Sequence, residues 1–182
     1  MGPVRLLTTG PFDAVALDTR GPYWKLSGPL ARLKDHLVEL GVNPVGRLIG
    51  IFYDDPGETP AEDCRFTLCY PVSGEHAQSV ARAHGGAGPP HAAPAAEADR
   101  TTAPLERDVV SVRTFPASLV AAVEYRGPSA DSPAAYEHLR EWLAASDHLP
   151  AGAPRELYLA EPGTLGSGLM HVEVHQPLVA EG

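Results

Sequence analysis

Apolar residues gather in eight short stretches of the chain that are predicted to be strands, and in the last of them hydrophobic and polar residues alternate with the period of two that is typical of a strand with one buried face. The predicted strands are residues 4–8, 13–19, 47–53, 64–70, 110–115, 119–125, 155–160 and 170–176. Between the second and third strand of each set of four, the apolar residues change to helical spacing. They are Leu30, Leu33, Leu37 and Leu40 in the first set, and Tyr136, Leu139 and Leu143 in the second. Each set reads strand-strand-helix-strand-strand, which predicts an α+β fold with one helix on each small sheet.

The two sets of elements are copies of one another. Arg20-Gly21-Pro22 falls on Arg126-Gly127-Pro128 at an offset of 106 residues (126 − 20), and Pro56-Gly57 falls on Pro162-Gly163 at the same offset. The shared residues include the glycines and prolines that fix turns, so both halves are expected to have the same backbone course. We therefore predict a pseudo-twofold tandem repeat.

The repeat also predicts how the chain is organised. Residues 1–73 form the first repeat and residues 109–182 the second, and together they are expected to make one compact domain. Between them, residues 74–108 are a connector whose centre, about 83–104, is rich in glycine, proline and alanine and has no periodicity. We predict that this connector is flexible and begins with a short helical turn ending at His76.

The composition argues against several classes of function. The 182 residues carry a formal net charge of −9, and their 14 lysines and arginines are not clustered, so direct nucleic-acid binding is not expected. The sequence has no run of ~18 apolar residues and no signal-peptide pattern, which predicts a cytoplasmic protein without membrane contact. Cys64 and Cys69 lie on one predicted strand and point to opposite faces, which favours two core thiols over a disulfide.

Two segments carry a resemblance to a known family. GIFYDDPGETPAEDCRFTLCYPV (50–72) and VRTFPASLVAAVEYRGP (112–128), together with the repeated Arg-Gly-Pro turn, resemble the GyrI-like small-molecule-binding superfamily. This superfamily includes the effector-binding domains of AraC-type regulators, with a SOUL-like repeat fold. The resemblance implies a ligand groove between the two repeats, opposite the helices. It also implies hydrophobic, aromatic or cationic ligands, held by aromatic walls and by a glutamate on the last strand.

Glu173 occupies the position that the resemblance gives to this glutamate. It lies in the stretch LMHVEVHQPL (169–178), where Val172 and Val174 are expected to face the helix. The same alternation puts His171, Glu173 and His175 on the opposite face. In the first half, Thr67 takes the place of Glu173, so only one half is expected to supply a carboxylate. The connector is longer than the family pattern, and the two histidines are not part of it.

The aromatic walls that the resemblance implies have several candidates. They are Trp142, Tyr136, Tyr125, Phe52 and Tyr158. Aromatic faces stack on flat ligands and hold cations over the ring. Tyr136 keeps the helical period, which favours a core position over a pocket position. For Trp142 and Tyr158 the pattern leaves pocket and core open.

A metal site on the last strand is weighed as an alternative. His171, Glu173 and His175 are all possible ligands, but three residues of one flat strand bind a single ion poorly and no further ligand is evident. We therefore predict no metal and no other cofactor.

Three functions remain open from the sequence. In the first, the chain binds a hydrophobic, drug-like small molecule and gives self-protection or drug resistance by sequestration. In the second, it is a hydrolase that opens the cyclopropane ring of DNA-alkylating natural products, with Glu173 activating water and with Trp142 and Tyr158 holding the substrate. In the third, it is a protein-interaction module that modulates DNA gyrase. No helix-turn-helix pattern is present, so a regulatory role would need a separate protein partner.

Overall fold

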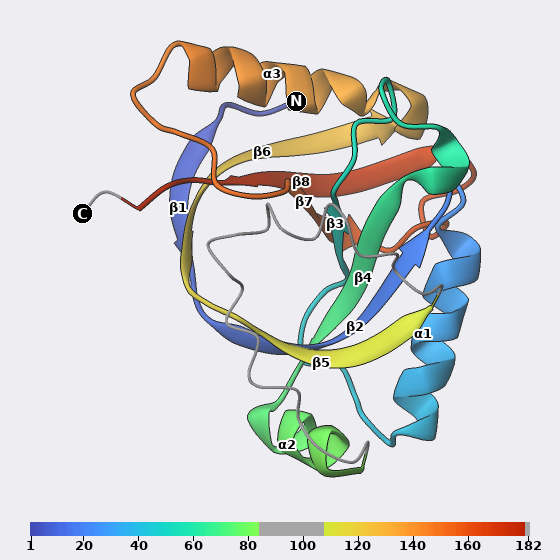
Figure 1. Ribbon diagram of the computed structural model, residues 1–182. Helices are drawn as coiled ribbons and strands as arrows, with labels where there is room; N and C mark the ends of the chain where they lie inside the picture. Colours follow the sequence, from blue (N-terminus) through green and yellow to red (C-terminus); the bar gives the residue numbers. More distant parts are fainter. Residues whose placement is uncertain (84–107, 181–182) are drawn as a thin grey trace.

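A computed structural model describes residues 1–83 and 108–180 of the chain (Figure 1). The strands are β1 (Arg5–Thr9), β2 (Phe12–Arg20), β3 (Ile49–Phe52), β4 (Arg65–Val72), β5 (Val109–Phe115), β6 (Ser118–Pro128), β7 (Arg155–Ala160) and β8 (Leu169–Pro177). The helices are α1 (Ser27–Glu39), α2 (Gly74–Ala83) and α3 (Pro133–Ala144), and there are short 3₁₀ turns at Ala61–Asp63 and Ser129–Asp131. Each predicted strand overlaps one observed strand, and the α+β class is confirmed.

The strands form one antiparallel sheet whose order is symmetric about its centre. The order is β1-β6-β8-β7-β3-β4-β2-β5, and exchanging equivalent strands of the two halves gives the same order read from the other edge. The first strand of each half pairs with the other half, β1 with β6 and β5 with β2. Strands β3 and β7 meet at the centre. The offset found in the sequence also holds for the elements, because β2, α1 and β3 begin 106 residues before β6, α3 and β7 (118 − 12, 133 − 27 and 155 − 49).

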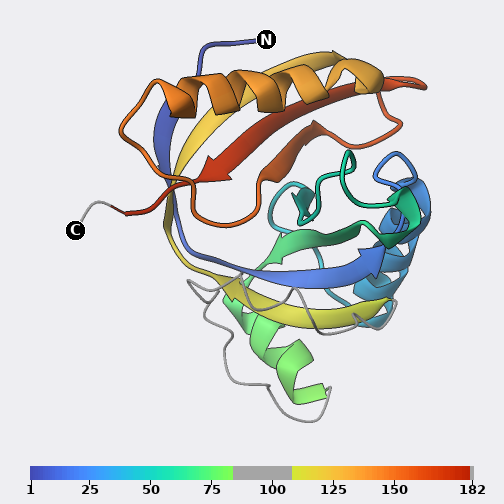
Figure 2. The same cartoon turned by 45° about the horizontal axis from the view of Figure 1, so that its top comes forward.

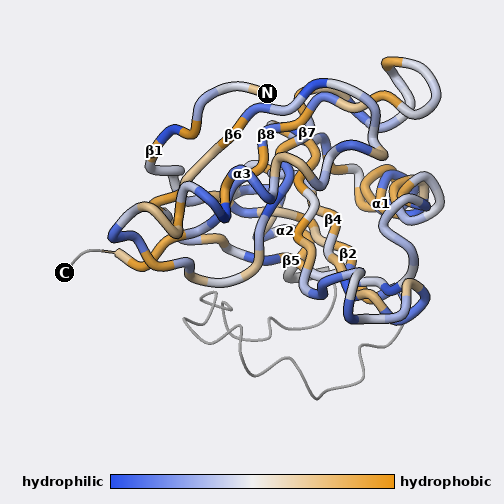
Figure 3. The backbone as a smooth tube through the Cα atoms, turned by 90° about the horizontal axis from the view of Figure 1, so that it is seen from above, coloured by the Kyte–Doolittle hydropathy of each residue, from blue (hydrophilic) through white to orange (hydrophobic). Residues whose placement is uncertain are grey.

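Both long helices cover the same face of the sheet. Leu33 and Leu37 of α1 and Leu139 of α3 are buried in one apolar cluster with Val172 and Val174 of β8. Helix α1 contacts β2 and β4, while α3 contacts β6 and β8, so each helix covers its own half (Figure 1). Hydrophobic residues recur along β6, β8, β7 and β4, where this core is built (Figure 3). We call this face the helix side.

Residues 74–83 correct one part of the connector prediction. They form helix α2 instead of a flexible segment, and His76 does not end a turn but lies in the helix. Ala77 and Val80 are buried in the helix-side core, because their three-residue spacing puts both on one helical face. The remainder of the predicted flexible centre, from residue 84 to 104, lies outside the described residues.

The sheet is curled, and its second face is the inside of the curl. Four strand spacings of about 4.8 Å separate β5 from β7, which is about 19 Å in a flat sheet. Yet the guanidinium carbon of Arg155 on β7 lies 5.5 Å from the centre of the Phe115 ring on β5. Only a curled sheet brings these side chains together, and Figure 2 shows the resulting half-barrel with the helices outside. We call the concave face the inner face.

Among the described residues, no helix has both the length and the apolar character that a membrane crossing needs.

Candidate functional site

The predicted site residues are divided between the two faces of the sheet. In the pairing of β7 with β8, Tyr158 lies opposite Val172, and Leu157 lies opposite Glu173. Val172 belongs to the helix-side core, so Tyr158 faces the helices and Glu173 faces the inside of the curl. The structure therefore does not bring Glu173 and Tyr158 together in one groove.

The inner face carries Glu173 and its neighbours on the last strand, as strand alternation predicts. The Glu173 carboxylate is 14% exposed and accepts a hydrogen bond from Arg5 at 2.7 Å. Its second oxygen lies 2.6 Å from Nε2 of His175. Nε2 of His171 lies 2.7 Å from a carboxylate oxygen of Glu124 on the neighbouring strand. This hydrogen bond lowers the pKa of Glu124. Glu173 is thus held between two basic side chains and does not point into open solvent.

Thr67, the counterpart of Glu173, lies on the same inner face in the other half. Its hydroxyl is fully buried and donates to Asp18 at 2.5 Å. The hydroxyl of Tyr53 lies 2.9 Å from the same threonine oxygen, and Arg113 donates to the second oxygen of Asp18. The two halves therefore carry different polar networks on the concave surface.

The predicted aromatic walls lie on the helix side. Phe52, Tyr125 and Tyr158 are buried, whereas Tyr136 and Trp142 of α3 are partly buried against the same core. Tyr125 donates its hydroxyl hydrogen to the carbonyl of Pro128 at 2.7 Å and so braces the turn that follows β6.

Trp142 and Phe52 contact different neighbours. Trp142 stacks on His148 with ring centres 5.6 Å apart. Trp142 follows Tyr136 by six residues, which corresponds to about 9 Å along the helix axis. Phe52 packs edge-to-face on Tyr23 at 4.8 Å, in the first half. The five aromatic residues therefore all pack against the helix-side core, although Trp142 and Phe52 have different ring partners.

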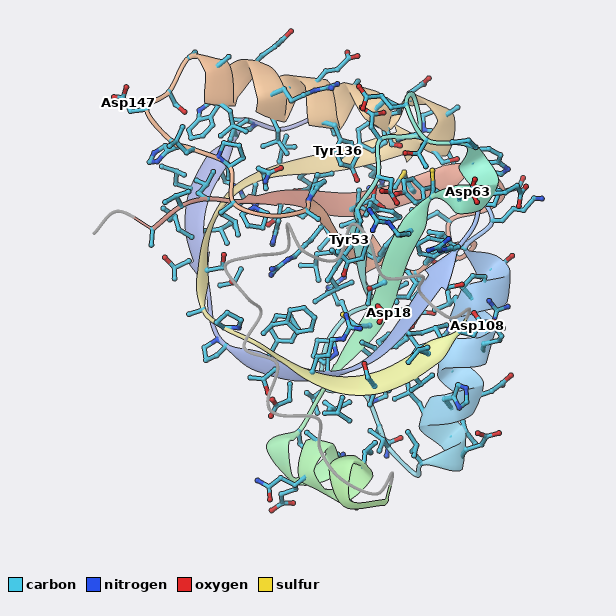
Figure 4. All side chains as sticks on the ribbon, viewed as in Figure 1. Asp18, Tyr53, Asp63, Asp108, Tyr136 and Asp147 are labelled. Atoms are coloured by element: carbon cyan, nitrogen blue, oxygen red, sulfur yellow. The ribbon has the colours of Figure 1, made fainter. Side chains whose placement is uncertain are left out.

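A buried carboxylate lies among these rings, and it is not one of the residues predicted from the sequence. Glu156 of β7 is 6% exposed and faces the helix side together with Tyr158. The hydroxyl of Tyr136 donates to one carboxylate oxygen at 2.7 Å, and the hydroxyl of Tyr158 donates to the other at 2.6 Å. Figure 4 places Tyr136 beneath α3, on the helix side of the sheet. The alternation in RELYLA is the signal that puts Glu156 on the face of Tyr158.

The electrostatics of this cluster are those of an anion removed from water. Burial raises the pKa of Glu156, and the hydrogen bonds from the two tyrosines lower it in part. Burial, reinforced by the nearby carboxylate, raises the pKa of Tyr136 and Tyr158 well above the usual range, so both phenols remain donors near neutral pH. Within the described part of the chain, no lysine, arginine or histidine forms an ion pair with Glu156.

The sheet centre is tightly built around this carboxylate. Gly50 of β3 lies directly opposite Glu156 and is also its counterpart in the repeat (156 − 50 = 106). A Cβ atom at Gly50 would lie 2.9 Å from the ring of Phe52 and 3.4 Å from the ring of Tyr158. Glycine at this position therefore lets the two aromatic rings approach the backbone beside Glu156.

Comparison with known proteins defines the class of the protein as a small-molecule-binding domain. A family model described as the GyrI-like small molecule binding domain matches residues 2–178. The chain belongs to this family. A search of curated proteins gave no match.

Solved structures with the same fold include a protein seen in complex with DNA and a hydrolase. The C-terminal domain of EcmrR is 16% identical with a TM-score of 0.66, and the alignment covers 98% of each chain. Our chain spans 58% of the longer EcmrR chain in an EcmrR–DNA complex. A hydrolase encoded by lin2189 from Listeria innocua is 12% identical with a TM-score of 0.59, over 97% of this chain and 91% of that one. SAV2435, solved with bound tetraphenylphosphonium, is 12% identical with a TM-score of 0.53, over 98% and 95%. At these identities the likeness is one of fold.

Proposed function

We propose that the protein binds a hydrophobic organic cation on the helix side of the central strands, with Glu156 as the counter-ion. The observation that carries the proposal is the buried Glu156 carboxylate, which is bonded to two phenols and to no cation of the described residues. An ionised carboxylate without a positive partner is costly to bury, about several kcal/mol per ion. A lipophilic cation offsets that cost, and the tyrosine rings attract it through their faces.

Tyr136 is the residue through which a ligand reaches this acid. It comes from α3 and is partly exposed, whereas Tyr158 lies within the sheet and is 3% exposed. A ligand that displaces the Tyr136 hydroxyl from Glu156 exposes one carboxylate oxygen while Tyr158 continues to hold the other. The Tyr158 and Phe52 rings on the two central strands then form the floor.

The comparisons support this class of ligand. The family is one of small-molecule-binding domains, and SAV2435 has been solved with tetraphenylphosphonium, an aromatic cation. Binding of such a compound lowers its free concentration, and we propose self-protection or drug resistance by sequestration as the biological role. Modulation of DNA gyrase stays a prediction from the family resemblance.

The experiment is a calorimetric titration of the full chain with tetraphenylphosphonium. We expect saturable binding near neutral pH and a loss of at least about tenfold in affinity for Glu156→Gln, because a charge-assisted contact is worth about 1.5–3 kcal/mol. Glu137→Gln, at an exposed carboxylate next to Tyr136 on α3, is the matched control and is expected to bind like the wild type. Equal affinities for wild type and Glu156→Gln would contradict the proposal.

A hydrolase is a second candidate, and it concerns the inner face. Glu173 and His175 form a short carboxylate–imidazole contact of 2.6 Å in which both side chains retain some exposure. Such a pair activates water when a substrate lies within reach. Incubation with a cyclopropane-bearing alkylating compound, followed by mass spectrometry, is expected to give a hydrated product that Glu173→Gln does not form. Tyr158 has no part in this reaction, because it faces the helices.

A further inference from the structure

Arg155 occupies the centre of the inner face. It lies between Ile51 of β3 and His175 of β8 in the strand pairing, and its neighbour Glu156 points to the other side of the sheet. The guanidinium carbon lies 5.5 Å from the centre of the Phe115 ring. The Arg155 side chain therefore extends across the concave surface towards β5 and covers an aromatic face with its charged end.

Unlike Arg5 and Arg113 on the same surface, Arg155 has no acidic partner among the described residues. Arg5 pairs with Glu173 and Arg113 pairs with Asp18. Among the described residues no carboxylate pairs with Arg155, and its Nε atom is buried without a hydrogen-bond acceptor. A buried donor without an acceptor costs about 1–3 kcal/mol, and more when it is charged. The position is therefore one that an added acceptor stabilises.

A second arginine lies on the strand and face of the ring that Arg155 covers, because Arg113 precedes Phe115 by two residues on β5. Burial raises the pKa of the Cys69 thiol to about 12, and the charges of both Arg113 and Arg155 act in the opposite direction. Asp18 is the carboxylate of this group and is bonded to Thr67 and Arg113, so two positive charges face one negative charge. The group is locally positive in a chain whose formal net charge is −9.

We infer that the inner face binds a small oxyanion, a carboxylate or phosphate group, between Arg155 and Arg113. The guanidinium of Arg155 presents its N–H donors in one plane, and Phe115 borders it at 5.5 Å, so an acceptor approaches from a side that the ring leaves open. The hydroxyl of Tyr53, 2.9 Å from Thr67, lies on the same concave surface (Figure 4). The site is on the opposite side of the sheet from Glu156 and does not depend on the proposed cation site.

The first test observes Arg155 itself in the wild-type protein. Inorganic phosphate, and separately acetate, is titrated at constant ionic strength while the arginine Nε–H signals are followed by nitrogen-edited NMR. We expect a saturable shift of the Arg155 signal with at least one of the two anions, and the stronger one identifies the oxyanion class. Absence of a saturable shift with both anions would overturn the inference.

The second test compares variants of the full chain by thermal denaturation with the same anions. The anion is expected to raise Tm in the wild type and in Arg32→Gln, which removes a surface arginine of α1 that pairs with Asp108. The rise should disappear in Arg155→Gln. Arg155→Lys keeps the charge but loses the planar fork, so at least about a tenfold loss of affinity is expected. If the anion raises the Tm of Arg155→Gln and of Arg155→Lys as much as it raises the Tm of the wild type, the site is refuted.

The same titration separates this inference from the cation site. Glu156→Gln is expected to bind the anion like the wild type, because its side chain faces the helices. If Glu156→Gln loses tetraphenylphosphonium but keeps the anion effect, the two sites are independent. Loss of the anion effect in Glu156→Gln would contradict a separate inner-face site.

Discussion

Glu156 and Gly50 lie directly opposite one another on the two central strands, and they are also counterparts in the internal repeat. At the centre of the sheet, one half therefore carries the carboxylate of Glu156, and the other half has a glycine without a side chain at the equivalent position. The bare position leaves room for the rings of Phe52 and Tyr158, and the carboxylate is held by two tyrosine hydroxyls. The centre of the repeat is asymmetric in charge, which suits it to a ligand with one positive group.

Replacing Glu156 by Gln is expected to stabilise the free protein. The pKa of Glu156 is raised in the folded state above its ordinary value of 4.5, so the folded protein binds more protons than the unfolded one in the window above that value. Stability from this group is therefore present at low pH and is lost as the pH rises through the folded pKa. We expect Glu156→Gln to raise Tm near pH 7 by about 2–4 °C, the shift from roughly 1 kcal/mol in a chain of this size.

Thermal melts of wild type and Glu156→Gln at several pH values check this linkage. The difference in Tm should be small near pH 4.5 and grow as the pH increases. Glu137→Gln serves as the control and should show no such trend, since Glu137 is exposed. A difference that shrinks with rising pH would contradict a buried, destabilised carboxylate.

Binding of a permanent cation is expected to become tighter as the pH rises through the pKa of Glu156. A protonated Glu156 offers no charge, so the ligand binds the ionised form and lowers the pKa of the carboxyl group. Calorimetry with tetraphenylphosphonium in two buffers of different ionisation enthalpy measures the protons released on binding. Proton release at a pH near the folded pKa is the expected result, and proton uptake would show that another group controls binding.

The two tyrosines are expected to contribute unequally to the buried acid. Tyr158→Phe removes the donor that is buried in the sheet, and it should cost about 1–3 kcal/mol of stability near pH 7, because one carboxylate oxygen then lacks a partner. Tyr136→Phe removes a donor whose side chain comes from helix α3 and is partly exposed as a whole residue, and a smaller cost is expected because this side chain can move aside and admit water. Urea denaturation measures both costs. Equal costs for the two variants would argue against Tyr136 as the point of access.

Gly50→Ala tests the close approach of the rings. The added methyl group lies 2.9 Å from the Phe52 ring, so we expect a loss of about 1–3 kcal/mol from overpacking. In a Phe52→Leu background the same change should cost less, because the ring that it meets is absent. A double-mutant cycle by urea denaturation measures this coupling. An equal cost in both backgrounds would place the strain elsewhere.

Local periodicity was sufficient to predict the strands, the two long helices and the side of each residue on the last strand. The position of Val172 and Val174 against the helices follows from alternation alone, and so does the inner-face position of Glu173. Helix α2 was not predicted, although Ala77 and Val80 carry the required spacing, because its sequence merges with the glycine- and proline-rich connector.

The arrangement of the site depends on contacts between distant residues, which the sequence pattern does not contain. The register between β7 and β8 decides that Tyr158 and Glu173 face opposite sides, and the curl of the sheet brings Arg155 to Phe115. The family resemblance predicted a ligand-binding glutamate on the last strand. The alternation along β7 predicts that Glu156 and Tyr158 share one face of the sheet. The burial of Glu156 depends on Tyr136, which packs over it from the distant helix α3.

The most direct test of the central claim uses two ligands of the same shape and opposite charge. Tetraphenylphosphonium and tetraphenylborate are titrated into the wild type and into Glu156→Gln by calorimetry near neutral pH. If Glu156 is the counter-ion, the wild type prefers the phosphonium by at least about tenfold, and Glu156→Gln loses most of this preference. A wild type that binds both ions equally, or a variant that keeps the full preference, would show that Glu156 does not select the charge of the ligand.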